Sequence, residues 1–534
     1  MNYTFDIIVF ATYLIGMIAI GYFSGKGNKT QEDYLLAGRD MPWFPIALSV
    51  SATMISANSF VGGPGWAYGS GIAPFMVNIT VPLAVFFAVY VTTPVIYHLK
   101  VTSVYEYMEY RLGGYSRNLT VAQFFINSLI QVSSMVFVPA LILQKITGWE
   151  LNLIVPIIVI VAIIYTLLGG IRAVIWTDTV QSLVLWAGII LAIVIPLQSM
   201  EMGFFETIGQ AKLAGKLEAL NFEFNLTNNN AFWASLIGGT MMWIRYFSFD
   251  QAQVQRILTS RSMKGLKSSY ASSAVIMNIT YFVTLLVGLI LFVYYGGKEF
   301  ASSNDVMISF ILEELPVGMI GLVVAGAFAA AMSSVDSLLN SMTTVFIKDI
   351  YEKYFYKGEG EVSLRTTMII STVFGVIIIF VVILAFGGTV RSVLDLVGNY
   401  ISYFSGPACG AFLLAMFTYK ANDKGVAGGF ATGFILGYII AKSVGTGWLW
   451  NPAIGASITI VVGYLLSLVF AENSKPVEDI KKFTAQGMRA KMIAEGVERD
   501  EDGVSLLPFS MDKYSIFLLG FFVLQYVVLV LINL

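Results

Sequence analysis

Charged side chains are scarce in this sequence of 534 residues, and their scarcity excludes a water-soluble protein of this size. Asp, Glu, Lys and Arg together make up 12% of the chain, whereas hydrophobic residues make up 57%. The mean hydropathy is +0.77. Soluble domains carry about 25% charged residues. The composition therefore predicts a chain that lies largely within a membrane.

Other absences narrow the function. The sequence has one cysteine, Cys409, and one histidine, His98, so it offers no internal disulfide and no cluster of residues for haem, zinc or a redox relay. No segment matches G-x-x-x-x-G-K-[ST], which argues against ATP-driven pumping by this chain. The longest hydrophilic segment, 473–512, is too short for an appended soluble domain. We therefore expect a transporter driven by a gradient, or a passive one, and not an enzyme.

About fourteen apolar segments are long enough to span a bilayer, since a span needs roughly 20 residues. Their centres lie near residues 14, 55, 86, 132, 161, 187, 240, 283, 331, 376, 408, 434, 460 and 523. The connections after odd-numbered segments hold 24 of the 31 Lys and Arg residues, and we interpret runs such as Arg256 to Lys267 as solvated loops. The positive-inside rule makes these loops cytoplasmic and both termini external. We expect the protein to lie in the plasma membrane, which in a bacterium is the inner membrane.

The second apolar segment, 43–71, is unusually rich in small and polar residues. It includes Ser49, Ser51 and Ser59 and ends in Gly62-Gly63-Pro64-Gly65. Proline lacks a backbone donor and glycine accepts almost any dihedral, so we expect helical bonding to fail near residues 62–65 and to leave carbonyl oxygens free. Free carbonyls at membrane depth suit a hard cation. A closely packed helix interface with a simple kink is the alternative.

The ninth apolar segment carries a second group of oxygens. Ser333, Ser337, Asn340 and Ser341 recur at a spacing of three to four residues, which places them on one helical face. Serine hydroxyls in membrane helices often only bond back to their own helix. Asp336 is different, because a carboxylate within a span costs about 2.5 to 3.5 kcal/mol on insertion scales. An ion, a proton or a partner charge is expected beside it.

A further carboxylate, Asp178, follows the fifth segment, one turn before Gln181. It could cap a helix at its first turn, pair with Arg172, or contribute to an ion site. Two aspartates facing each other in the membrane should either bind sodium or share a proton.

Four motifs in this order resemble the sodium/solute symporter family, which includes sodium-coupled galactose, proline, glucose and monocarboxylate carriers. They are Glu32 to Arg39, Gly169 to Gln181, Gln251 to Arg256 and Ala329 to Ser341. The resemblance extends from about residue 5 to 470. It implies an all-α polytopic protein with a LeuT-like core of two inverted five-helix repeats. The chain would then divide into the first helix and loop (1–42), the two repeats (43–200 and 201–420) and the peripheral helices (421–534).

The resemblance also implies sodium-coupled symport by alternating access, with a passive facilitator of the same fold as the alternative. Sodium is the only cofactor expected, and no nucleic acid or obligate protein partner is indicated. The family's principal sodium site falls on Ala52, Ile55, Ala330, Ser333 and Ser334. A second site, present in some members, falls on Asp178, Ser333, Asp336 and Ser337.

The family's sugar-binding positions fall on Ser59, Asn78, Trp243, Tyr246 and Asn278, while Val81 replaces a serine. No charged pair remains at these positions. Arg245 could meet an anionic substrate, pair with Asp250 or reach an aqueous vestibule. A sugar, a sugar acid and a small carboxylate all remain open as substrates.

Overall fold

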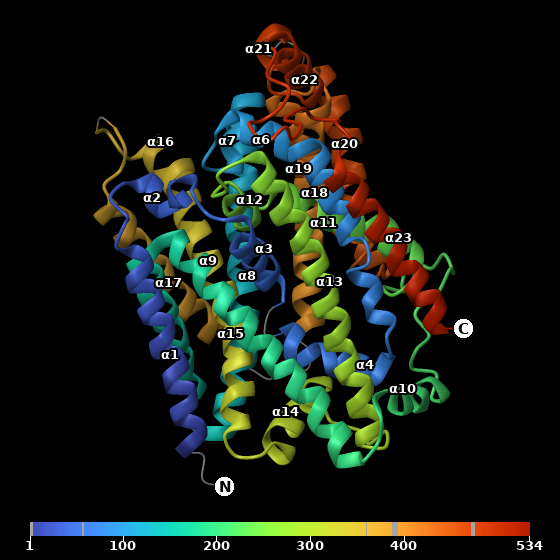
Figure 1. The fold of residues 1–534 in the computed structure, drawn as a ribbon. Helices are drawn as coiled ribbons and strands as arrows, with labels where there is room; N and C mark the ends of the chain where they lie inside the picture. Colours follow the sequence, from blue (N-terminus) through green and yellow to red (C-terminus); the bar gives the residue numbers. More distant parts are fainter. Residues whose placement is uncertain (1–3, 56–57, 359, 387–392, 471–475, 534) are drawn as a thin grey trace.

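The computed structural model describes residues 4–55, 58–358, 360–386, 393–470 and 476–533. These residues are almost entirely helical, with only two isolated β-bridges among them. The long helices run side by side as a bundle (Figure 1). Eleven of the described helices are long and apolar enough to cross a membrane, or twelve if one bent pair counts as a single span. The prediction of an all-α polytopic membrane protein is confirmed.

The long helices have the following bounds: α1 Thr4–Gly25, α3 Trp43–Met54, α8 Gly114–Thr147, α9 Leu151–Met200, α11 Thr240–Phe249, α13 Met263–Tyr294, α15 Met319–Val345, α17 Leu364–Phe386, α18 Val393–Phe417, α19 Asp423–Val444, α20 Asn451–Val469 and α23 Lys513–Asn533. Four shorter helices, η3 Ala73–Val77, α5 Val81–Phe87, η4 Ala88–Thr92 and α6 Thr93–Leu99, together make up the candidate span Ala73–Leu99. The other short helices continue or connect the long ones: α2 Gln31–Leu36, η1 Ala37–Arg39, η2 Asn58–Gly62, α4 Gly63–Ser70, α7 Val104–Arg111, α10 Phe204–Leu213, η5 Ala234–Gly239, α12 Gln251–Ile257, α14 Ser303–Ser309, η6 Phe310–Glu314, η7 Phe346–Tyr351, α16 Glu352–Tyr354, α21 Val477–Lys481 and α22 Ala485–Ala494.

The span count of fourteen is not confirmed, for two structural reasons. Helix α9 contains both the fifth and the sixth predicted segments, which meet at Gly170 with φ 57° and ψ −151°. A Cβ there would lie 2.4 Å from the Tyr34 carbonyl oxygen, so only glycine allows this close approach. The seventh segment is divided between η5 and α11, and neither piece is long enough to count as a span. The number fourteen therefore stays a prediction.

The connecting elements are sorted between the two ends of the bundle. Helices α2, α7, α16, α21 and α22, which follow odd-numbered predicted segments, lie at one end, whereas α10, α14 and the start of α1 lie at the opposite end (Figure 1). This sorting agrees with the charge bias of the sequence. The compartment that each end faces stays a prediction, and we refer to the first as the predicted cytoplasmic end.

Two helices of the core are interrupted. Helix α3 ends at Met54, Ile55 has the non-helical dihedral ψ 73°, and the chain bends by 64° before it continues through η2 and α4. Helix α11 ends at Phe249, and Asp250 at ψ 125° separates it from α12. The Asp250 side chain accepts a hydrogen bond of 3.0 Å from the Ala252 backbone N–H and so caps α12.

The first interruption was predicted, but its position was wrong. Residues 63–70 form helix α4, with Pro64 in its first turn, instead of an irregular stretch. Proline is well tolerated there because that N–H has no helical partner in any case. The break lies earlier, at Ile55. The interruption at Asp250 was not predicted at all.

Helix α15 lies at the centre of the molecule. It packs against α1, α3, α8, α9 and α17, and every residue from Val323 to Val345 is buried. Helix α3 packs against α9, α13 and α15, so its broken end lies within the bundle. Outer helices such as α1 and α23 instead present many exposed apolar side chains, as expected of lipid-facing surfaces.

The interpretation of Arg256 to Lys267 as a solvated run is wrong at both of its ends. The Arg256 side chain is fully buried, as described below. The Lys267 ammonium is 1% exposed and lies 2.7 Å from an Asp512 carboxylate oxygen and 2.9 Å from the Ser505 carbonyl oxygen. These lysine contacts hold α13 to the start of α23, so the charge has a structural partner.

Candidate functional site

The broken end of α3 lies against the middle of α15. The Ser333 hydroxyl donates to the Ala52 carbonyl oxygen at 3.3 Å, and the Ser334 hydroxyl donates to the Thr53 carbonyl oxygen at 3.1 Å. Both hydroxyls also lie 3.2 Å from the Ala330 carbonyl oxygen. The last carbonyls of a helix have no intrahelical donor, and here two of them face serine hydroxyls. Four of the five residues predicted for the principal sodium site are thus brought together.

The fifth residue, Ile55, lies where the helix ends. Its backbone N–H still donates to the Ser51 carbonyl oxygen at 3.2 Å, and its own dihedrals leave the helical region. The side chain is buried. Hydroxyls and main-chain carbonyls together form a compact set of hard oxygen ligands without a formal charge, which is the ligand type that sodium takes at unwound membrane helices.

A second group of oxygens continues directly from the first. Asp336 accepts a hydrogen bond of 2.7 Å from the Tyr165 hydroxyl and one of 3.1 Å from the Ser337 hydroxyl. The Ser337 hydroxyl lies 3.4 Å from that of Thr53 and donates to the Ser333 carbonyl oxygen. Asp336 is completely buried. The Ser333 hydroxyl therefore belongs to the first group and its carbonyl oxygen contacts the second, while sodium binding at the second group stays a prediction.

Asp178 is also completely buried, but its surroundings differ from the prediction. Its Oδ2 accepts a hydrogen bond of 2.5 Å from the Ser49 hydroxyl and lies 3.6 Å from a guanidinium nitrogen of Arg256. Arg256 in turn donates to the Ser49 hydroxyl at 2.7 Å. Arg172, the partner considered earlier, donates to the Ala37 carbonyl oxygen instead. Asp178 lies well inside α9, so it does not cap a helix.

The role of Arg256 was missed because the sequence places it next to a basic loop. A signal was nevertheless present, since Gln251 to Arg256 is one of the four motifs that carry the family resemblance. Arg256 also acts electrostatically on both buried aspartates. The described residues contain no group of three or more His, Cys, Asp or Glu that would hold a metal ion.

Three of the predicted substrate residues, Asn78, Trp243 and Tyr246, lie on neighbouring elements. The Trp243 indole donates to the Val77 carbonyl oxygen at 2.8 Å, directly beside Asn78. Trp243 makes an edge contact with Tyr246 at 5.8 Å between ring centroids, and the Tyr246 hydroxyl accepts from Gln253. These contacts hold the ring of Tyr246 between α11 and α12.

The other two predicted substrate residues are less clearly grouped. Ser59 lies on η2, just beyond the break of α3, and is partly exposed. Asn278 is buried and lines a cavity of about 150 Å³ with Phe75 and Phe282, against α23. The structure therefore places Asn278 at a packing junction with the peripheral helix.

Arg245 forms an ion pair with Asp250 across the second helix break, and both side chains are almost completely buried. Of the three alternatives for this arginine, the structure shows the pairing with Asp250. The pair connects the end of α11 to the cap of α12.

Two interrupted helices around buried oxygen clusters define the class of secondary active transporters with a LeuT-like fold. The model of the sodium:solute symporter family matches residues 34–433. The chain belongs to this family. It is a membrane protein with many spans, and it transports a small molecule together with sodium.

Curated relatives cover most of the chain. The human sodium-coupled monocarboxylate transporter 1 is 31% identical over 81% of this chain and 72% of its own length. The rabbit sodium-dependent multivitamin transporter is 29% identical over 85% and 74%. A sodium/sialic acid symporter of Aliivibrio fischeri is 26% identical over 92% and 98%.

Two solved structures resemble the chain. A sodium-coupled sialic acid symporter, in a substrate-bound outward-open state described as revealing a novel sodium site, matches with a TM-score of 0.78 and 26% identity over 87% of this chain and 98% of that one. The nucleobase-cation symporter Mhp1 matches with a TM-score of 0.58 at 14% identity, over 85% of this chain and 99% of that one, and it supports the fold alone.

Proposed function

We propose that this symporter carries a small organic anion with a carboxylate group, and that Ala52, Ile55, Ala330, Ser333 and Ser334 bind the principal sodium ion. The observation that carries the ion site is the pair of serine hydroxyls on α15 that face the free carbonyls of α3. A sodium ion at this place would replace hydrogen bonds between neutral groups by ligands to a charge, which are stronger.

The same geometry suggests how the ion and the substrate are coupled. The ion would bridge α3 to α15 at the break, and the chain that leaves the break forms η2 with Ser59. Fixing the break by ion ligation would therefore also fix the start of the segment that contacts the substrate. Binding energy from the ion would lower the cost of ordering the substrate site.

The carboxylate class is supported by what the relatives are named for: monocarboxylates, vitamins and sialic acid. In this chain the charge of Arg245 is already compensated by its ion pair with Asp250, so the proposed anion contacts do not include Arg245. The Ser59 hydroxyl and the Asn78 amide are the neutral donors proposed for the anion. Trp243 and Tyr246 would cover the apolar part of the solute.

A second sodium ion is proposed at Asp336 and Ser337, beside Ser333. Asp178 is a weaker member of this site than its charge alone suggests, because its Oδ2 is already shared by Ser49 and Arg256. Its Oδ1 has no hydrogen-bond partner and could complete the site.

Uptake into proteoliposomes tests the proposal. The purified chain would be assayed with lactate, nicotinate, sialic acid and galactose under inward gradients of sodium, potassium or protons. We expect at least one of the carboxylates to accumulate above its equilibrium level under the sodium gradient and under no other gradient. Galactose should not be taken up. Accumulation of galactose, or of no carboxylate, would overturn the substrate class. Equal uptake without a sodium gradient would instead indicate a passive facilitator.

A further inference from the structure

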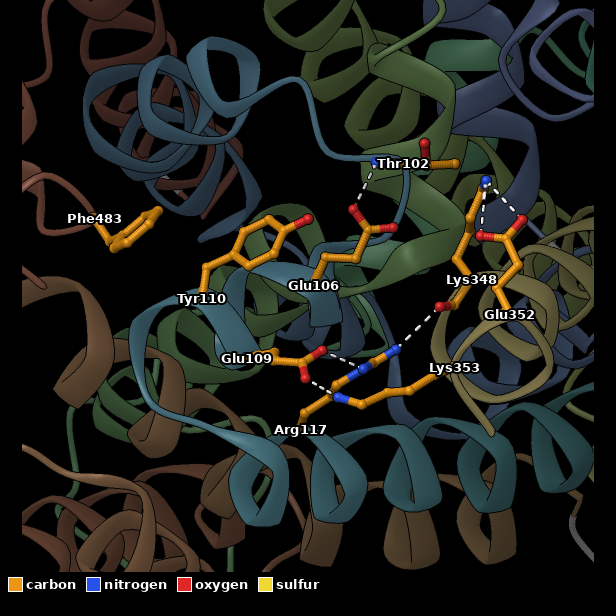
Figure 2. A pocket seen from close by; sticks show the side chains of 9 residues that line it. All are labelled: Thr102, Glu106, Glu109, Tyr110, Arg117, Lys348, Glu352, Lys353 and Phe483. Atoms are coloured by element: carbon orange, nitrogen blue, oxygen red, sulfur yellow. Dashed lines mark hydrogen bonds and ion pairs between the residues drawn. The ribbon is translucent and has the colours of Figure 1, made fainter. Parts of the chain in front are cut away.

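A polar pocket lies at the predicted cytoplasmic end, away from both ion sites. It has a volume of about 760 Å³ and lies between α7, the start of α8, the η7–α16 segment that continues α15, and Phe483 after α21 (Figure 2). We call it the α7 pocket. Its lining residues are Thr102, Glu106, Glu109, Tyr110, Arg117, Lys348, Glu352, Lys353 and Phe483.

The cations of the α7 pocket already have carboxylate partners. Lys348 lies 2.9 Å from Glu352, and Lys353 forms an ion pair with Glu109. Arg117 also pairs with Glu109, and its Nε lies 2.8 Å from a carboxylate oxygen of Asp349. Figure 2 shows the pairs of Glu352 with Lys348 and of Glu109 with Lys353 and Arg117. Each cation is therefore neutralised within the protein.

Glu106 is the lining carboxylate that takes part in no ion pair among the described residues. It accepts a hydrogen bond from the Thr102 backbone N–H at 3.4 Å, a long distance for such a bond. The side chain is partly buried, and in Figure 2 it lies beside Tyr110. Counting the lining residues and Asp349 alone, four ionised carboxylates face three cations, and the carboxylate left without an ion pair is Glu106. An unpaired, partly buried carboxylate favours a bound cation.

The walls beside Glu106 are aromatic. The rings of Tyr110 and Phe483 lie 6.1 Å apart between centroids, with their planes inclined by 29°. The chain's own Lys482 ammonium already lies 5.2 Å from the Phe483 ring centroid, so Phe483 offers a ligand apolar surface and not its charge-binding face. An anionic oxygen beside aromatic faces suits an ammonium group on an alkyl chain. The volume is also far larger than a bare inorganic ion needs.

We propose that the α7 pocket binds an organic ammonium ion from the cytoplasm, with its charge on the Glu106 carboxylate and its alkyl part against Tyr110 and Phe483. The bound ion would join α7 to the connection between α21 and α22, which carries Phe483. Lys348 and Glu352, on the η7–α16 segment that continues α15, line the same pocket. This inference does not depend on the proposed substrate or sodium ligands.

The site should be sensitive to pH near neutrality. Burial, with the nearby charge of Asp349, raises the pKa of Glu106 to about 7, while Lys348 opposes the shift. Around Glu106 the other charged groups, Glu109, Arg117, Glu352 and Lys353, are held in the pairs described above. Glu106 is protonated below its raised pKa, so ammonium binding should be weak at pH 6 and stronger at pH 8. Titration through pH 7 changes the ionised fraction about tenfold between these values.

Saturation-transfer NMR on the full chain in phosphatidylcholine nanodiscs provides the test. The probe is butylamine, and 1-butanol is its neutral counterpart. We expect butylamine to bind at least about tenfold more tightly than butanol at pH 8, since a hydrogen bond to a charged group is worth about that much. Equal binding of the two, or butylamine binding that does not change between pH 6 and pH 8, would overturn the proposal.

Variants locate the site. Glu106→Gln should weaken butylamine binding about tenfold, whereas Glu361→Gln, an exposed glutamate in the nearby loop, should leave it unchanged. Tyr110→Leu should weaken it about threefold and Tyr110→Phe should not, because the ring and not the hydroxyl is required. An unchanged affinity in Glu106→Gln would refute the assignment. If that variant fails to fold, the pH dependence of the wild type decides. Displacement of butylamine by equimolar KCl would identify an inorganic cation and refute the organic one.

Discussion

Replacing Ser334 by alanine removes one oxygen of the proposed principal sodium site without adding bulk. The hydroxyl is buried and lies between two carbonyl oxygens, at 3.1 Å from Thr53 and 3.2 Å from Ala330. An interaction of this kind with a charged partner contributes about 1.5 to 3 kcal/mol. Because 1.4 kcal/mol corresponds to a factor of ten, the half-saturating sodium concentration should rise about ten- to hundredfold. Transport at saturating sodium should persist.

The assay is substrate uptake into proteoliposomes as a function of external sodium. Ser341→Ala is the matched control, since Ser341 is a buried serine on the same helix whose hydroxyl donates to the Ser337 carbonyl oxygen at 2.7 Å. It lies two turns from Ser334 and should leave the sodium dependence unchanged. An unchanged half-saturation in Ser334→Ala, or an equal rise in both variants, would refute the placement of the ion.

The remaining predictions concern the second ion, the buried arginine and the topology. The Hill coefficient for sodium should exceed one in the wild type and fall toward one in Asp336→Asn; a value of one in both would leave a single ion. Arg256→Gln should lower the thermal stability of the solubilised protein, because breaking a buried ion pair costs about 3 to 5 kcal/mol. Adding Asp178→Asn should restore part of the lost stability, and strictly additive losses would contradict the pairing. In sealed cells, an impermeant thiol reagent should label Lys212→Cys but not Lys357→Cys, and the reverse would invert the topology.

Much of the fold could be predicted because the bilayer imposes simple rules. Apolar segments of sufficient length, with basic residues sorted between alternate connections, indicate the spans and their direction. A proposed break in the second segment followed from its small and polar residues. Its position did not, because Pro64 can begin a helix as well as end one. The kink at Gly170 likewise depends on a contact with Tyr34, far away in the sequence, so no local pattern could reveal it.

The polar network around the site was harder to predict than the site itself. The motif positions placed Ser333 and Ser334 against the end of α3, and the structure brings them there. Arg256 and Lys267 were misjudged because charge counting treats every cation outside an apolar segment as solvated. Whether such a cation is buried depends on which helices fold over it. Here Asp178 and Asp512, both distant in sequence, supply the partners.

The buried arginine alters the charge balance on which the number of sodium ions depends. If Asp178 and Asp336 are both ionised, they carry two negative charges in the bundle, Arg256 offsets one of them, and a single cation neutralises the charge that is left. Sodium at Asp336 would be that cation, in addition to the ion at the serines. For a monoanionic substrate, one sodium makes transport electroneutral and the membrane potential contributes nothing. Two sodium ions carry one net charge, worth about 2.3 kcal/mol at 100 mV, or roughly 50-fold accumulation. A carboxylate carrier with the second ion is therefore electrogenic, and the same carrier without it is not.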